Sequence, residues 1–216
     1  KYSTISEVAN QCGYSSHSSF IKAFRNKFDV APKEWRNGAY IKHSNSILKA
    51  SNISTSPSVD FSKLSATIVN MPDMKSYYIR NNGYINNVKE TWQKLYTLLL
   101  NNDVKKYQML ALLHDNPTIT DLDNCQYIAC IITDEQEEVF TKRLPKFKIS
   151  GGVYAKFDLQ GKGEDIFRFI QWVYHVWLVD SEYETTTKPS FIVYHKNNYL
   201  ENENDFDISY YLSINF

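Results

Sequence analysis

The sequence predicts an α+β protein, in which an N-terminal all-α unit of two short helices precedes a duplicated β-α-β-β domain. Apolar residues recur at helical spacing at the start of the chain, and a Ser-, Asn- and Thr-rich stretch follows. Beyond that stretch, a strand–helix–strand–strand pattern occurs twice, with a glycine turn before each helix. We therefore divide the chain into a helical head (1–42), a linker (43–64) and a C-terminal domain (65–216).

The first predicted helix has one apolar face. Its apolar residues fall at i, i+3, i+4 and i+7, and they are Ile5, Val8, Ala9 and Cys12. Gly13 follows at the place where helices end in a left-handed residue. A turn is therefore expected directly after Cys12.

The second predicted helix is aromatic on one face and polar on the other. Ser15 and Ser16 offer an N-cap, and phenylalanine recurs every four residues from Phe20 to Phe28. The opposite face carries His17, Ser18, Lys22 and Arg25. Such a helix suits insertion into a DNA major groove. An ordinary helical hairpin with a solvated basic face fits the spacing equally well.

Residues 5–36 also resemble the C-terminal helix-turn-helix of AraC-type transcription regulators. The residues that fit the family pattern are Ile5, Val8, Ala9, Gly13, Tyr14, Ser16, Ser18, Phe20, Lys22, Phe24, Arg25, Phe28, Ala31, Pro32, Trp35 and Arg36. In that family the start of the second helix touches bases, which implies base contacts by His17, Ser18 and Lys22. The candidate phosphate contacts, which position the unit without reading sequence, are Ser19, Arg25, Lys27 and Lys33.

One feature departs from the AraC pattern. AraC-type modules carry two such units in tandem, joined by a long helix, and this chain begins inside or just before the second unit. Because it also starts at Lys1 rather than methionine, we interpret it as the C-terminal part of a longer protein. A single unit makes fewer phosphate contacts than two, so we expect weak DNA binding by this part alone.

The segment between the two parts has the composition of a linker. It is rich in Ser, Asn and Thr, contains Pro57 and shows no sustained apolar period. A short helix is expected at about 39–50, so the first residues of this segment overlap its end.

The C-terminal domain repeats one pattern of elements. In the first half the predicted strands are 66–80 around Pro72, 107–114 and 127–133, and the predicted helix is 88–99. In the second half the predicted strands are 152–159, 190–195 and 207–214, and the predicted helix is 166–177. We infer two antiparallel sheet units, each covered on one face by its helix and related by a pseudo-twofold.

The second helix of this domain is apolar almost all round. It is therefore covered on more than one side, either as a tightly buried core helix or with one flank lining a cleft. The chain holds 16 Tyr, 12 Phe and 4 Trp, so an aromatic-walled pocket for a lipophilic molecule is physically reasonable.

Charge differs between the two parts of a neutral chain. Residues 1–49 hold eight basic and three acidic side chains, a net of +5, and the remainder holds 16 against 21, a net of −5. A basic module joined to an acidic one is typical of a DNA-reading head on a sensing domain. The three cysteines and five histidines show no disulfide framework, metal spacing or nucleophile–base arrangement, and no apolar run reaches membrane-spanning length. We expect a cytoplasmic protein with no membrane span, metal or cofactor.

The region from 65 to 216 resembles the GyrI-like effector-binding domain. The matching pieces are Tyr78-Ile79-Arg80 with Gly83-Tyr84, His114-Asp115-Asn116-Pro117, Gln126-Tyr127-Ile128-Ala129-Cys130, Gly152-Val153-Tyr154-Ala155 leading to Gly161, and Phe191-Ile192-Val193-Tyr194. The resemblance implies a duplicated β-α-β-β fold with a central groove for hydrophobic, often cationic, molecules. Some relatives hydrolyse small molecules.

Two positions depart from this family. Members commonly carry an acid where this chain has Ile128, and a cation-reading glutamate where it has Ile192. Losing both carboxylates removes an attraction for cations and a potential general base. We therefore expect a neutral lipophilic ligand and no enzymatic activity. Alternatively, the isoleucines pack a closed core that binds nothing.

The candidate effector-binding residues come from the strand motifs and the helix positions. They are Tyr84, Trp92, Ile128, Tyr154, Trp172, Ile192 and Tyr194. For Trp92 and Trp172 a plain core role is equally compatible. The predicted function is a transcription regulator that binds double-stranded DNA and a small lipophilic effector. The alternative is a small-molecule-sequestering or hydrolysing protein with a vestigial DNA-binding head.

Overall fold

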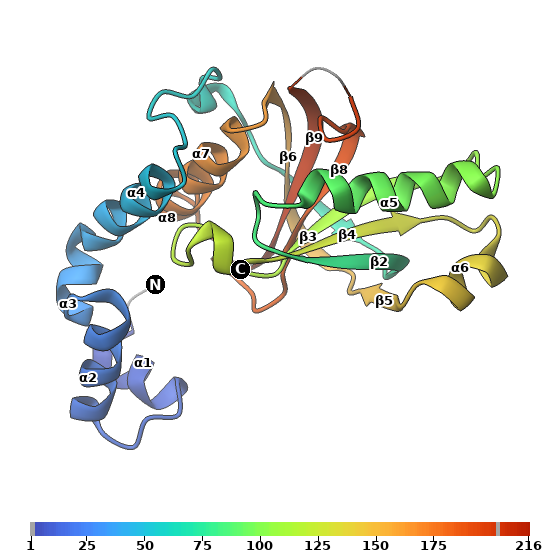
Figure 1. Ribbon diagram of the computed structural model, residues 1–216. Helices are drawn as coiled ribbons and strands as arrows, with labels where there is room; N and C mark the ends of the chain where they lie inside the picture. The colour runs from blue at the N-terminus through green and yellow to red at the C-terminus, as the bar shows by residue number, and fades with distance from the viewer. Residues whose placement is uncertain (1–2, 202–203) are drawn as a thin grey trace.

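A computed structural model describes residues 3–201 and 204–216 (Figure 1). The chain forms an N-terminal helical head and a C-terminal domain built on one curled antiparallel sheet, so the predicted α+β class is confirmed. The elements of the head are α1 (Ile5–Gln11), α2 (His17–Phe28), α3 (Pro32–Glu34), the kinked turn η1 (Trp35–Ala39) and α4 (Tyr40–Ala50).

Capping residues fix the ends of the first two helices. The Thr4 hydroxyl accepts a hydrogen bond from the Glu7 N–H, and the Glu7 carboxylate accepts one from the Thr4 N–H. Gly13, at φ +80°, makes the left-handed turn after α1. Ser16 then caps α2 by accepting from the Ser19 N–H at 3.1 Å.

Aromatic packing holds the head together and sets the direction of α4. The Trp35 ring lies 4.4 Å from the Phe28 ring and 5.7 Å from the Phe24 ring, centroid to centroid. Gly38, at φ +108°, then breaks the helical path, so α4 leaves in a new direction toward the C-terminal domain. Residues 43–50 of the predicted linker lie in α4, where the short helix near 39–50 was expected.

The C-terminal domain contains one sheet, not the two separate sheets that we predicted. Its strands are β1 (Thr67–Met71), β2 (Met74–Asn82), β3 (Gln108–Leu113), β4 (Gln126–Ile132), β5 (Lys146–Ile149), β6 (Gly152–Lys162), β7 (Glu184–Thr185), β8 (Ser190–Lys196) and β9 (Asp205–Asn215). The order is β1-β6-β9-β8-β3-β4-β2-β5, with β7 paired to β9. The two halves join because β3 pairs with β8 along their length.

The main helices cover the same face of this sheet. They are α5 (Val88–Asn101) and α7 (Asp165–Trp172), which continues through η4 (Val173–Trp177) and α8 (Leu178–Asp180). The shorter elements are η2 (Phe61–Lys63), η3 (Leu122–Asn124) and α6 (Glu137–Arg143). Side chains from α5 and α7 share one large hydrophobic core with the sheet, which puts both helices on one face.

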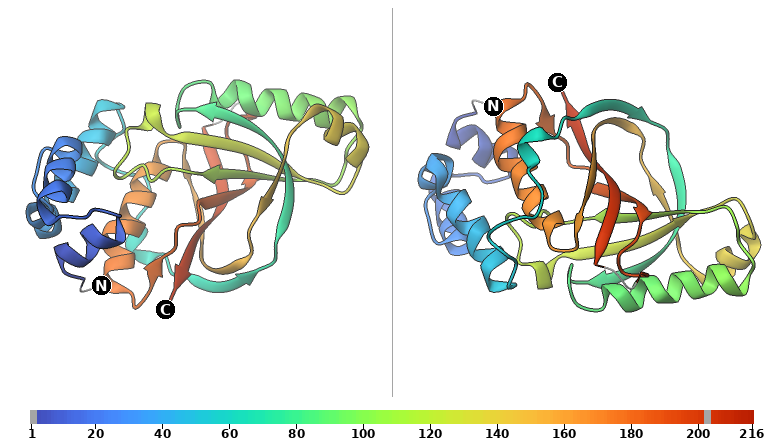
Figure 2. Two further views of the ribbon diagram at one scale, coloured as in Figure 1. Left: turned by 90° about the horizontal axis from the view of Figure 1, so that it is seen from below. Right: turned by 90° about the horizontal axis from the view of Figure 1, so that it is seen from above.

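The opposite face, which we call the helix-free face, carries a second, smaller core. Figure 2 shows the outer strands arching around this face, so that the sheet forms a half-barrel. Alternate strand residues point into it, for example Leu110 and Leu112 of β3, while Ala111 points to the helix-covered face. The two faces are therefore separate environments.

Candidate functional site

The outer face of α2 is exposed and carries polar and basic side chains. Ser18, Lys22 and Arg25 line one shallow surface depression together with Ile21 and Asn26. Phe20 is buried on the inner side of the helix. Figures 1 and 2 place this head at one end of the molecule, beside α7 and α8 and away from α6. A long partner can therefore approach α2 without meeting the sheet.

All of the predicted DNA-contacting residues are solvent-exposed, but they do not share one face. They are His17, Ser18, Ser19, Lys22, Arg25, Lys27 and Lys33. At 3.6 residues per turn, Lys27 lies roughly 180° around α2 from Ser18. Lys33 lies on α3, and the Ser19 N–H is already bonded to Ser16. The structure thus brings together Ser18, Lys22 and Arg25, while the role of each residue stays a prediction.

The helix-covered face holds a chain of buried polar aromatic groups. The Trp92 indole N–H donates to the Tyr127 hydroxyl at 2.8 Å, and the Tyr127 and Tyr194 hydroxyl oxygens lie 3.1 Å apart. The Trp92 and Tyr194 rings also meet edge to face at 5.3 Å. Tyr127 was not among the predicted residues, although alternation along β4 puts it on the same face as Ala129 and Ile131.

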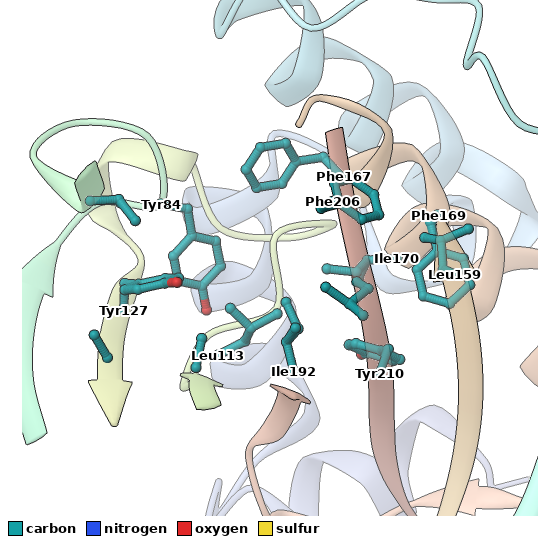
Figure 3. Close-up of a cluster of buried hydrophobic side chains, with 14 of the residues drawn as sticks. Tyr84, Leu113, Tyr127, Leu159, Phe167, Phe169, Ile170, Ile192, Phe206 and Tyr210 are labelled. Atoms are coloured by element: carbon teal, nitrogen blue, oxygen red, sulfur yellow. The ribbon is translucent and has the colours of Figure 1, made fainter. Parts of the chain in front are cut away.

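Two further tyrosines border this chain. The Tyr84 hydroxyl donates to the Asp115 carbonyl at 2.5 Å and accepts from the Asp115 N–H at 3.0 Å. Figure 3 shows Tyr84 and Tyr127 on one side of Leu113 and Ile192, with Tyr210 and the α7 side chains on the other. The Tyr210 hydroxyl is fully buried and makes no hydrogen bond of normal geometry with the described residues, although the Ser190 and Tyr174 side chains lie close enough to it to affect its pKa. An unpaired hydroxyl is a place where a ligand could bond.

Burial raises the pKa of these phenols. Desolvation lifts the pKa of Tyr84, Tyr127, Tyr194 and Tyr210 well above the usual value for tyrosine. The phenols are therefore neutral hydrogen-bonding groups near pH 7. The one buried acid in the described part of the chain is Asp165 at the start of α7, and its carboxylate accepts hydrogen bonds from Ser58 and the Lys162 N–H and from none of these phenols.

The predicted effector residues are split between the two faces of the sheet. Tyr84, Trp92, Trp172, Ile192 and Tyr194 belong to the helix-covered core, whereas Ile128 and Tyr154 belong to the helix-free core. A single pocket containing Ile128 and Ile192 was therefore a wrong prediction, because alternate strand positions point to opposite sides.

Most of these residues are closely packed. Trp92 is 0% exposed, Ile192 3% and Ile128 6%. Trp172 packs in an aromatic cluster with Phe61, Phe157 and Phe169. Of the seven, Tyr194 alone lines the 530 Å³ cleft at one end of β3 and β8, where Tyr107 and Met109 also lie. The core between α5 and α7 is closed in this conformation.

The head is bound to the C-terminal domain through α4 and α7. The Arg168 guanidinium donates to the Asn45 side chain at 3.1 Å and to the Ser54 carbonyl at 2.7 Å. Gln171 donates to the Ser44 hydroxyl at 2.9 Å. Because α7 borders the tyrosine core and α4 leads to α2, this α4–α7 contact connects the two parts of the molecule.

The described residues contain no helix with the length and apolar character that crossing a bilayer requires. Nor does the part of the chain that the structure describes contain a cluster of His, Cys, Asp or Glu able to hold a metal ion. Cys125 and Cys130 are unpaired and buried, and burial raises the pKa of each thiol to about 12.

The chain belongs to the family of GyrI-like small molecule binding domains, whose model matches residues 65–215. The model of bacterial regulatory helix-turn-helix proteins of the AraC family matches residues 1–37. Both resemblances inferred from the motifs are thereby confirmed. No protein of curated function matches the sequence.

Solved structures share the fold at low sequence identity. The C-terminal domain of EcmrR is 12% identical to this chain, with a TM-score of 0.53, and the match covers 71% of this chain and 98% of the EcmrR domain. EcmrR in its complex with DNA is 16% identical to this chain, with a TM-score of 0.56, and the match covers 98% of this chain and 77% of the EcmrR chain. A hydrolase from Listeria innocua is 11% identical over 78% and 98% of the two chains, with a TM-score of 0.50.

Proposed function

We propose that this protein is a transcription regulator that binds double-stranded DNA through α2 and a small, neutral, lipophilic molecule through its C-terminal domain. The observation that carries the proposal is the combination of an exposed polar and basic α2 face with a GyrI-like domain, joined by the α4–α7 contact. EcmrR, a structural neighbour, is described in a complex with DNA, which supports the same reading here.

The proposed DNA contacts centre on Ser18, Lys22 and Arg25. We expect Lys22→Ala and Arg25→Ala each to weaken binding to the DNA upstream of the protein's own gene and to reduce the salt slope by about one. Lys142→Ala removes the same charge from exposed α6 and is the matched control. Binding that both α2 variants leave unchanged would contradict the proposal.

The effector is proposed to lie between α5 and α7, beside Tyr127, Tyr194 and Tyr210. The buried hydrogen-bonding groups there are phenols and an indole, none of which carries charge near pH 7. Such a lining favours a neutral ligand with at least one hydrogen-bond acceptor for the Tyr210 hydroxyl. Binding requires the closed core to open, which we propose to be the step that the ligand drives.

We further propose that the two β-α-β-β repeats are related by a pseudo-twofold. The strand order supports it, because β2, β4 and β3 follow one another from one side as β6, β9 and β8 do from the other. Such an axis would pass between the adjacent central strands β3 and β8. The proposed ligand position lies over this junction, where residues of both repeats meet.

A fluorescence titration tests the ligand class directly, because Trp92 lies in the tyrosine chain. The probes are 4-tert-butyl-4′-methoxybiphenyl and its isosteric cation, 4-methoxy-4′-(trimethylammonio)biphenyl, and the methoxy oxygen of each is an acceptor for the Tyr210 hydroxyl. We expect quenching by the neutral compound at lower concentration. Tighter binding of the cation would show that a carboxylate reaches the site and would contradict the neutral assignment.

We propose that the protein is not an enzyme. General base catalysis needs a group that is unprotonated near pH 7, and the buried phenols have raised pKa values. His195 lies 2.8 Å from the Ser209 hydroxyl, but that buried hydroxyl donates its hydrogen to Asp158 and is therefore not activated by the imidazole. Incubation with p-nitrophenyl acetate should release product no faster than buffer does. If product is released faster than in buffer, and Tyr194→Phe abolishes this excess, the hydrolytic alternative would be favoured.

A further inference from the structure

A second cleft lies between the head and the C-terminal domain, away from the tyrosine chain. Its volume is 650 Å³, and its walls come from both parts of the molecule. The head contributes Trp35, Arg36 and Tyr40, and the domain contributes residues of η4, α8, β7 and the 118–119 loop. Clefts of this size at domain interfaces are common positions for small-molecule sites.

The walls of this junction cleft are aromatic and apolar, and part of that surface faces solvent. Val179 is 49% exposed and Ile119 39% exposed, although both are large apolar side chains at the interface. The Tyr40 ring packs edge to face on His175 at 4.8 Å, and Tyr183 also lines the cleft. The lining therefore offers flat aromatic contacts to a planar ligand.

Charge selects among planar ligands. Arg36 is exposed and forms no ion pair with any residue of 3–201 or 204–216. Burial lowers the pKa of His175, which keeps that ring neutral near pH 7. Arg36 is the one Lys or Arg side chain among the described residues that line the cleft, so the lining provides a partner for a single carboxylate. One carboxylate, directed at Arg36, is the charge pattern that fits.

We propose that the junction cleft is a second small-molecule site, which binds a planar aromatic monocarboxylic acid with its carboxylate at Arg36. Trp92, Tyr127 and Tyr194 do not line this cleft, so the site differs from the proposed effector position, although Tyr174 of its wall also interacts with the Tyr210 side chain. A ligand held between Trp35 or Tyr40 and α8 contacts both parts at once. Its binding therefore fixes the head relative to the domain.

The probe for this site is 2-naphthoate, with 2-naphthamide as its neutral isostere. We expect calorimetry on the full chain to show that 2-naphthoate binds more tightly than 2-naphthamide. Arg36→Gln should lower the affinity for 2-naphthoate roughly three- to tenfold and leave the affinity for 2-naphthamide unchanged. Ile119→Trp, which fills the cleft from an exposed position, should weaken both compounds. Tyr194→Phe, at the other site, should weaken neither.

Hydrogen exchange then locates the bound probe. Slower exchange is expected in residues 35–40 and 174–185 together, because these segments form opposite walls of the cleft. Protection confined to α5 and β8, equal loss of both probes in Arg36→Gln, or no binding at millimolar 2-naphthoate would each overturn the proposal.

Discussion

At the residue scale, two buried tyrosines should respond in opposite ways to loss of the hydroxyl. Tyr127→Phe leaves the Trp92 indole N–H buried without its acceptor, so we expect about 1–3 kcal/mol of destabilisation. Tyr210→Phe removes a hydroxyl that makes no hydrogen bond of normal geometry with the described residues, so stability should be unchanged or rise by up to about 1 kcal/mol. Urea unfolding of both variants measures the difference, and equal destabilisation would contradict it.

Asp165 should make stability depend on pH. Burial alone would raise the pKa of its carboxyl, but hydrogen bonds from the Ser58 side chain, the Lys162 N–H and the Ser58 N–H outweigh burial and lower the pKa. A carboxyl whose pKa is lower in the folded state stabilises above its unfolded value, near 3.9, and loses that contribution as pH falls through the folded value. Asp165→Asn should therefore flatten the acid side of a stability–pH profile below about pH 5, as measured by urea unfolding at a series of pH values.

Single residues also show where sequence patterns stop being informative. The motifs placed Ile128 and Ile192 correctly on strands, and both are buried. Which face each side chain takes depends on the register of β4, β3 and β8, in which Leu112 pairs with Ile128 while Ala111 pairs with Ile192. A shift of one residue along a strand moves a side chain to the opposite face of the sheet, and family motifs alone do not fix the register.

At the element scale, side-chain hydrogen bonds from α7 should hold α4 in place together with the burial of Ile47 and Leu48 in the large core. Arg168 is 9% exposed, and its hydrogen-bond partners are neutral oxygens, including those of Asn45, Ser54 and Gln171. Arg168→Met removes these bonds, so hydrogen exchange of residues 40–50 should accelerate about tenfold or more, while the central strands stay protected. The matched control is Lys49→Met, which also replaces a basic side chain with Met but at an exposed position of α4. Uniform acceleration of α4 and the sheet would mean global destabilisation instead.

Most elements followed from local patterns, but their assembly did not. Alternating or continuous apolar runs gave the central strands and both long helices near their observed bounds. Pro72 falls between β1 and β2, so the single strand predicted over 66–80 is a pair. The charged helix α6 and the short strands β5 and β7 carry little periodic signal and were not predicted. The single sheet depends on β3 pairing with β8, a contact between distant segments that no local pattern encodes.

At the scale of the whole molecule, the α4–α7 contact predicts coupling between the ligand and DNA. A ligand that opens the core between α5 and α7 displaces α7, and α7 carries the Arg168 and Gln171 side chains that are hydrogen-bonded to α4. If the ligand changes DNA affinity by some factor, DNA must change ligand affinity by the same factor. Titrating 4-tert-butyl-4′-methoxybiphenyl with and without DNA, and DNA with and without the ligand, measures that factor twice. Unequal values would show that one titration reports a different binding event.

Breaking the α4–α7 contact should then separate coupling from binding. In the double variant Arg168→Met/Gln171→Leu, α2 keeps its exposed face and the tyrosine chain keeps its own hydrogen bonds, since neither uses these side chains. Each ligand should therefore still bind alone, while the coupling factor falls toward one. Typical couplings are about 1–3 kcal/mol, or roughly 5- to 150-fold, so the loss is well within the range of a fluorescence titration. A variant that binds both ligands and keeps the full factor would show that the signal passes through another contact, and the junction cleft beside Trp35 and Tyr40 would be the next segment to alter.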